Sequence, residues 1–278
     1  MSFTWSPDDA PPEVRITVAG WLRAGSRMLA MCVILLTGVL VTAALRPPES
    51  FFWGLRRPWT PYITQAVCRA TLVVLGLAHR IEGRPMPGAG AVVANHSSWL
   101  DIFALNARKR VYFVSKSEVA GWPGIGLLAR LTGTVFIDRD PRQARHQTEI
   151  FEGRLQAGHR LLFFPEGTST DGLRVLPFRS TLFQAFFAEG LRDHLRVQPV
   201  SVIYQAPPWQ DRRFYGWWGD MSFGSHMLKV LSAARCGAVT VVYHAPVDVS
   251  DFPGRKALAT HCEAAVRAGM PPERRVAD

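Results

Sequence analysis

A histidine and an aspartate five residues apart, His96 and Asp101, form the pattern with the clearest chemical meaning in this chain. They lie in NHSSWLD, residues 95 to 101, directly after an apolar run. If His96 precedes a helix and Asp101 lies in its first turn, the carboxylate can fold back and accept a hydrogen bond from one ring nitrogen. The other nitrogen then takes a proton from a substrate hydroxyl. On the spacing alone, a structural histidine is the more common outcome.

A second polar segment, FFPEGTS at residues 163 to 169, also follows an apolar run. Gly167 allows the backbone to approach a ligand closely, and Thr168 and Ser169 can donate to phosphate or glycerol oxygens. The alternative is an ordinary turn in which Glu166 is a solvated charge.

A third segment, GTVFIDR at residues 133 to 139, ends in an arginine beside two aspartates. Its Arg139 follows a β-branched run, where a guanidinium could clamp an anionic group with two hydrogen bonds. A surface ion-pair cluster is the more common outcome for such a triplet.

Together these segments resemble the glycerolipid acyltransferases of the PlsC type, the lysophosphatidic acid acyltransferases. NHSSWLD is similar to the first block of that family, GTVFIDR to the second and FPEGTS to the third. VQPVSVIY, residues 197 to 204, resembles the fourth block and carries its proline at Pro199. Four blocks in the family's order are far more specific than any one of them.

The resemblance implies a role for each matched residue. His96 is then the general base and Asp101 its orienting partner. Arg139 binds the phosphate or other anionic group of the acceptor. The other matched residues are expected to hold the acceptor or, for the proline, to shape the acyl channel: Glu166, Gly167, Thr168 and Pro199.

One position departs from the family pattern. Many relatives carry arginine directly after Glu-Gly-Thr, where this chain has Ser169, so one cationic contact to the acceptor is missing. Arg179, ten residues further on, matches a basic position that follows the third block and compensates for it. Both residues are therefore candidates for acceptor binding, and the headgroup of the acceptor stays open.

The expected reaction is O-acyl transfer from acyl-CoA or acyl carrier protein to the hydroxyl of a lyso-lipid, with no metal ion and no cofactor. The first expectation for the acceptor is 1-acyl-sn-glycerol-3-phosphate, which gives phosphatidic acid. The alternative acceptor is lyso-ornithine lipid, whose headgroup carries a carboxylate. A non-enzymatic alternative is a membrane lipid-binding protein that retains the fold.

The elements that must position these residues alternate between strands and helices from about residue 80. This alternation predicts an α/β fold, a mixed β-sheet flanked by helices. The expected strands are residues 91–94, 111–114, 134–137, 161–164, 197–204 and 239–243.

The N-terminal part is apolar and predicts membrane-associated helices. Residues 28 to 45 carry no charge over 18 positions, close to the length that crosses a hydrocarbon core of about 30 Å. Spanning, a hairpin in one leaflet, a surface helix and a buried soluble helix all stay open. We expect a tail and membrane-associated helices at residues 1–79 and the acyltransferase domain at residues 80–278. The resemblance implies a bacterial inner membrane location, with the catalytic domain facing the cytoplasm.

The charge and the cysteines narrow the function classes further. The formal net charge of +10 points to an anionic partner. The apolar N-terminal run and the lack of a nucleic-acid-binding motif argue against nucleic acid and for a membrane and a lyso-lipid. Four cysteines, Cys32, Cys68, Cys236 and Cys262, are far apart, which indicates buried thiols rather than disulfides or zinc ligands.

Overall fold

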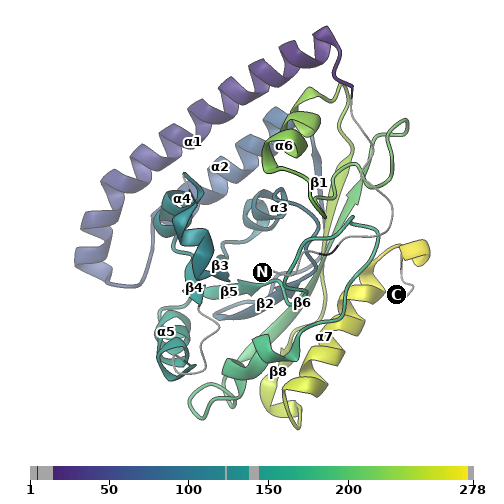
Figure 1. Ribbon diagram of the computed structural model, residues 1–278. Helices are drawn as coiled ribbons and strands as arrows, with labels where there is room; N and C mark the ends of the chain where they lie inside the picture. Colours follow the sequence, from purple (N-terminus) through teal and green to yellow (C-terminus); the bar gives the residue numbers. More distant parts are fainter. Residues whose placement is uncertain (1–4, 6–14, 123, 138–143, 275–278) are drawn as a thin grey trace.

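A mixed sheet is the centre of the computed structural model, with the strand order β1-β7-β6-β2-β5-β3-β4 and β8 beside β6 (Figure 1). The structure describes residues 5, 15–122, 124–137 and 144–274. β7 and β8 run antiparallel to β6, and the other pairs are parallel. The strands in chain order are β1 (Ala78–Gly83), β2 (Gly90–Ala94), β3 (Tyr112–Lys116), β4 (Val135–Ile137), β5 (Arg160–Phe163), β6 (Arg196–Gln205), β7 (Ala238–Tyr243) and β8 (Val247–Asp248).

Every strand expected from the sequence is present, with its ends shifted by no more than two residues. Two strands were missed. β1 is an edge strand with mostly exposed side chains, so it has no apolar run to reveal it, and β8 has two residues. β1 also straddles the expected boundary between residues 79 and 80, and that division of the chain stays a prediction.

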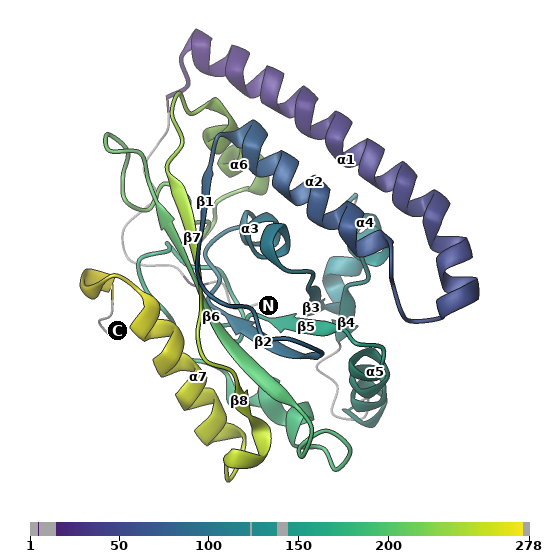
Figure 2. The ribbon, with the colours of Figure 1, turned by 180° about the vertical axis from the view of Figure 1, so that it is seen from behind.

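Helices cover both faces of the sheet (Figures 1 and 2). One apolar core joins α1, α2, α3 and α6 to the sheet, and the other joins α5, α7 and the 3-10 helix η3 to its opposite face. The α-helices are α1 (Val18–Trp53), α2 (Thr60–Leu75), α3 (Asp101–Arg108), α4 (Ile125–Thr132), α5 (Ala144–Gln156), α6 (Phe223–Ser232) and α7 (Arg255–Gly269). The shorter 3-10 helices are η1 (Ser117–Gly121), η3 (Ser180–Phe187), η4 (Val249–Asp251) and η5 (Pro272–Arg274).

The N-terminal helix α1 is much longer than the apolar run that predicted it, and it continues through Pro47 and Pro48. A buried carboxylate then closes the hairpin to α2. Glu49 accepts hydrogen bonds from the backbone N–H of Trp59 at 2.7 Å and of Thr60 at 2.9 Å, and from the Thr60 hydroxyl at 2.6 Å. It therefore supplies the N-terminal cap that α2 lacks from its own sequence.

Arginines attach this hairpin to the rest of the domain. Arg27 of α1 donates to the carbonyls of Leu231 at 2.9 Å and Ala233 at 2.7 Å, at the end of α6. Arg69 of α2 donates to Ala107 O at 2.7 Å, at the end of α3. The C-terminal end of a helix favours a cation, so these contacts hold α1 and α2 alongside the domain.

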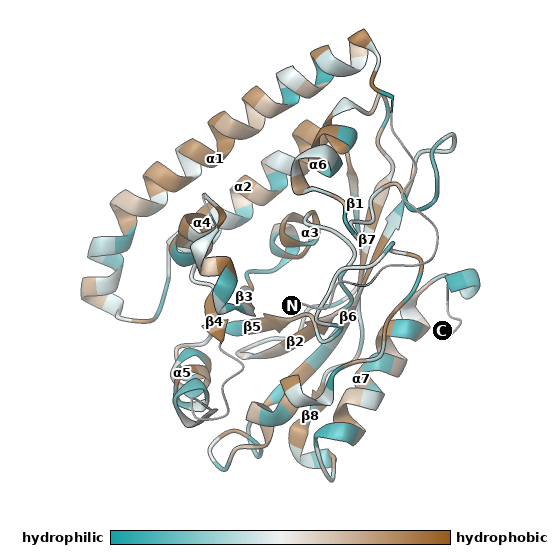
Figure 3. Cartoon of the chain, in the orientation of Figure 1, coloured by the Kyte–Doolittle hydropathy of each residue, from teal (hydrophilic) through white to brown (hydrophobic). Residues whose placement is uncertain are grey.

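The middle of α1 is apolar (Figure 3), and many of the apolar side chains on its outer face are exposed. The helix is long and apolar enough to cross a membrane by length and composition. From Leu29 to Leu40 its exposed apolar side chains recur every three to four residues, and Leu22 lies two turns before them on the same face, which gives a stripe. The stripe consists of Trp21, Leu22, Leu29, Val33, Leu36 and Leu40.

Candidate functional site

The segment after β2 holds His96 through its neighbour Asn95. The Asn95 side chain donates to Val202 O at 2.9 Å and accepts from Val202 N at 2.7 Å, so its amide extends the pairing of β2 with β6 by one residue. This fully buried contact fixes where the chain leaves the sheet. His96 follows at the carboxyl edge of the parallel strands, where ligands of open α/β sheets bind.

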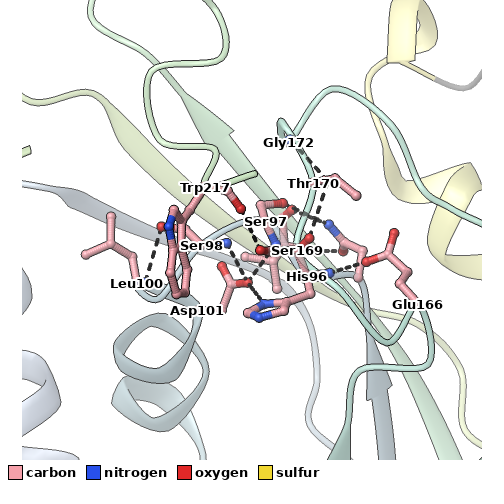
Figure 4. Close-up of polar contacts among 12 residues, drawn as sticks. His96, Ser97, Ser98, Leu100, Asp101, Glu166, Ser169, Thr170, Gly172 and Trp217 are labelled. Carbon is pink, nitrogen blue, oxygen red and sulfur yellow. Dashed lines mark hydrogen bonds and ion pairs between the residues drawn. The ribbon is translucent and has the colours of Figure 1, made fainter. Parts of the chain in front are cut away.

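His96 and Asp101 form the expected pair (Figure 4). Asp101 is the first residue of α3, and its Oδ2 lies 2.7 Å from Nδ1 of His96. The same oxygen accepts from the backbone N–H of Ser97 at 2.8 Å and of Ser98 at 3.1 Å. The aspartate thus folds back from the first helical turn, as predicted, and is fully buried. Because the Asp101 carboxylate accepts a hydrogen bond from Nδ1–H, the unprotonated nitrogen of the neutral ring is Nε2, which can act as a base.

The imidazole of His96 is buried on one side and open on the other. Its ring stacks on Phe164, with centroids 4.2 Å apart and planes 18° apart, and the side chain is 22% exposed. Among the residues that the structure describes, none forms a hydrogen bond with Nε2. The geometry thus holds the ring of His96 in one orientation, with Nε2 on its exposed side and without a hydrogen-bond partner among the described residues.

Tyr204 completes the contacts of Asp101 and was missed by the sequence analysis. Its hydroxyl donates to Oδ1 of Asp101 at 2.8 Å, and the tyrosine is only 3% exposed. Tyr204 is the last residue of the fourth block. Ser201, three positions earlier in β6, points to the opposite face of the sheet and donates to Val266 O of α7. The period of two along a strand was the signal that could have found Tyr204.

Glu166 binds main-chain groups in the structure rather than the open space of the site. Its carboxylate accepts from the backbone N–H of His96 and, at 2.8 Å, from that of Leu176. Burial raises the pKa of Glu166 to about 8, while the two N–H donors act in the opposite direction. It therefore positions the His96 backbone, and its contact with an acceptor stays a prediction.

The next residues of the third block turn sharply beside Arg179. Gly167 has φ +73°, and a Cβ built on it would lie 3.1 Å from Arg179 Nε. Thr168 accepts from the backbone N–H of Trp5 at 3.3 Å. The Ser169 hydroxyl donates to the carbonyl of Trp217 at 2.5 Å, so it fastens a neighbouring loop (Figure 4).

That loop, which follows β6, joins the first and third blocks. Trp217 N donates to Ser97 O at 2.8 Å, and Thr170 N donates to His96 O at 3.0 Å. The three segments thus hold one another around the histidine. The aromatic residues of this loop differ in burial: Trp218 is 1% exposed, whereas Trp209 is 56% exposed.

The structure does not bring one expected site residue, Pro199, to this place, and another cannot be compared with it. Arg139 lies outside the described residues. Pro199 pairs with Val93 in the sheet, and both belong to the face covered by α7, whereas Tyr204 and Asp101 lie on the opposite face. The side chain of Pro199 therefore points away from the His96–Asp101 pair, and its part in an acyl channel stays a prediction.

His226 lies outside the four matched blocks, and the structure gives it a structural role. Its Nδ1 accepts from the indole N–H of Trp99 at 2.9 Å. Burial, and then the nearby Lys229, lower the pKa of His226 to about 3, so it stays neutral in the core.

Comparison with known proteins places these residues among enzymes. Residues 78–203 match the protein family described as Acyltransferase. A lyso-ornithine lipid O-acyltransferase from Rhodobacter capsulatus is 58% identical over 266 residues, 96% of each chain. A 1-acyl-sn-glycerol-3-phosphate acyltransferase from Neisseria meningitidis is 31% identical over 205 residues, 72% of this chain and 77% of that one.

The fold has a counterpart among crystal structures. The 1-acyl-sn-glycerophosphate acyltransferase PlsC from Thermotoga maritima superposes with a TM-score of 0.61, covering 90% of this chain and 95% of that one. Its sequence is 21% identical, so this likeness concerns the fold alone.

Proposed function

The chain belongs to the PlsC-type acyltransferase family, and we propose that it transfers a fatty acyl group from a thioester to the hydroxyl of lyso-ornithine lipid. The observation that carries this proposal is the 58% identity over 96% of the chain to an enzyme named for that acceptor. The relative named for 1-acyl-sn-glycerol-3-phosphate is 31% identical over 72% of the chain. This reverses the order in which the motifs alone ranked the two acceptors.

The third block supports the same acceptor. Relatives that carry arginine after Glu-Gly-Thr have a cation where this chain has Ser169, and the Ser169 hydroxyl is bound to Trp217. A phosphate monoester carries up to two negative charges, whereas the ornithine headgroup has one carboxylate and one ammonium. A site with one cation fewer suits the second headgroup better. Arg179, beside Gly167, is the proposed partner of its carboxylate.

The proposed chemistry uses the pair at the edge of the sheet. His96 Nε2 takes the proton of the lyso-lipid hydroxyl while the oxygen of that hydroxyl attacks the thioester carbonyl carbon. The carbon–sulfur bond then breaks, and the leaving thiolate takes the proton back from the imidazolium. Asp101, bound to Nδ1, orients the ring and stabilises its protonated form. Acyl-CoA and acyl carrier protein are both proposed as donors, since the chemistry at the carbonyl is the same.

We further propose that the protein lies on a bilayer with α1 in the plane of one leaflet. Arg27 and Arg69 fasten both helices of the hairpin to α6 and α3, so a helix standing across the membrane would carry the domain into it. The exposed stripe from Trp21 to Leu40 faces away from the domain and suits the hydrocarbon boundary. The catalytic domain is expected on the cytoplasmic side of a bacterial inner membrane.

An acceptor comparison tests the proposal. Purified protein in mixed micelles receives a labelled acyl donor, offered once as acyl-CoA and once as acyl carrier protein, with lyso-ornithine lipid and lysophosphatidic acid at equal concentration. We expect label mainly in ornithine lipid. Label mainly in phosphatidic acid would restore the other acceptor, and no label in either would support the lipid-binding alternative.

A further inference from the structure

The two carboxylate oxygens of Asp101 have unequal surroundings. Oδ2 accepts from His96 Nδ1 and from the backbone N–H groups of Ser97 and Ser98. Oδ1 accepts from the hydroxyl of Tyr204 at 2.8 Å, its one donor among the described residues. Because Asp101 is fully buried, water cannot replace that donor.

Tyr204 is held firmly where it makes this bond. Its backbone carbonyl accepts from Arg274 Nη1 at 3.0 Å, and its ring lies beside that of Tyr215, with centroids 5.4 Å apart. Two residues earlier in β6, Val202 exchanges two hydrogen bonds with Asn95. Burial, and then the charge of Asp101, raise the pKa of Tyr204 well above its ordinary value, so the hydroxyl keeps its proton and remains a donor.

We propose that Tyr204 is a positioning residue that fixes the Asp101 carboxylate and lowers its basicity, so that Asp101 orients His96 without holding the imidazole proton too strongly. The inference rests on the proposed function and deepens it. A hydrogen bond to the far oxygen draws negative charge away from the one that faces His96. The same hydrogen bond prevents the carboxylate from rotating. Rotation would break the contact with Nδ1 of His96 and allow the tautomer in which Nε2 carries the proton.

Removal of the Tyr204 hydroxyl should shift the pH dependence of the reaction in one direction. In Tyr204→Phe, Asp101 keeps more of its charge on Oδ2 and stabilises the imidazolium more strongly. The protonated ring then persists to higher pH, and the acidic limb of the pH–rate profile moves upward by about half to one pH unit. The value of kcat falls about tenfold, whereas KM for the acceptor stays the same because Tyr204 lies behind Asp101.

The matched control is Tyr215→Phe. Tyr215 is also buried, at 1% exposure, and its hydroxyl accepts from Gly237 N at 3.0 Å without touching Asp101. The titratable groups that face the Tyr204–Asp101 pair are His96, Glu166 and Tyr215. Titration of Glu166 near pH 8 is common to the wild type and both variants, so it cannot produce a difference between them.

Two readouts separate this inference from the proposed function. The first is carbethoxylation of His96 by diethyl pyrocarbonate, followed by peptide mass spectrometry across pH, which reports the neutral imidazole without turnover. The second is kcat and KM across the same range. We expect both midpoints to rise in Tyr204→Phe and to stay unchanged in Tyr215→Phe, with thermal melting showing that both variants are folded.

Equal carbethoxylation midpoints in the wild type and Tyr204→Phe would overturn the inference, and so would the same shift in Tyr215→Phe. Absence of acyl transfer by the wild type would instead overturn the proposed function. The carbethoxylation midpoint would still decide whether Tyr204 acts on His96.

Discussion

The side chain of Arg179 lies across the Cα of Gly167, so close that a Cβ there would approach Nε to 3.1 Å and Cδ to 3.3 Å. The backbone of the two segments is also joined, since Arg179 N donates to Pro165 O at 2.9 Å. The third block and the arginine ten residues beyond it therefore form one unit. The absence of a side chain at Gly167 is what lets the guanidinium lie there.

Gly167→Ala is expected to displace Arg179 and weaken acceptor binding. The residue has φ +73°, so alanine adds backbone strain of about 1–2 kcal/mol and its Cβ pushes the guanidinium away. KM for the acceptor should rise about tenfold, because a charged hydrogen bond is misplaced. Steady-state kinetics and thermal melting measure the two effects.

Gly158→Ala is the matched control for that change. Gly158 has φ +86°, and a Cβ there would meet nothing within 4 Å, so it carries the same backbone strain without the contact. It should lose stability and keep its acceptor KM. Equal KM values for the two variants would show that Arg179 does not bind the acceptor.

Stability should fall with rising pH because of Glu166. Its folded pKa of about 8 lies above the ordinary value of 4.5, so the folded protein keeps a proton that the unfolded chain releases. The contribution is complete below about pH 4.5 and is lost as the pH rises to about 8. The free energy of unfolding, measured with urea in micelles between pH 5 and about pH 8, should therefore decline less steeply for Glu166→Gln than for the wild type. Parallel curves would mean that the N–H groups of His96 and Leu176 keep this carboxylate ionised throughout.

Charges on the outer stripe of α1 should release the protein from vesicles. Leu29 and Leu36 are 68% and 60% exposed, and burial of one leucine is worth about 1.5–3 kcal/mol. Leu29→Glu with Leu36→Glu should move most of the protein to the supernatant after sedimentation. Thr260→Glu with Ala264→Glu, on the exposed face of α7, adds the same charge and should leave binding intact. Vesicle binding by the first pair equal to the wild type would contradict the proposed orientation.

Much of the site could be predicted because its residues lie in short segments at strand ends. His96 and Asp101 are five positions apart, and the fold of one loop is enough to join them. Glu166 and Ser169 lie in the segment beside His96, where they bind main-chain groups, and their binding of an acceptor stays a prediction. A sequence does not show which backbone groups come near, and both side chains bind the main chain of other segments.

The residues that were missed depend on register and on distant packing. Tyr204 reaches Asp101 only because β6 lies beside β2 with Val200 opposite Ala94. The same alternation turns Pro199 to the other face. The full length of α1 was not predicted, because its last turns contain Pro47 and Pro48 and are held by Glu49, whose partner Thr60 lies eleven residues away.

The central claim is that His96 is the base for acyl transfer, and one measurement tests it most directly. Wild type and His96→Ala, each shown by thermal melting and vesicle binding to be folded and membrane-bound, receive a labelled acyl thioester and lyso-ornithine lipid. The account predicts labelled ornithine lipid with the wild type and a rate lower by about a thousandfold or more with His96→Ala. Turnover by the variant within a few-fold of the wild type would contradict it.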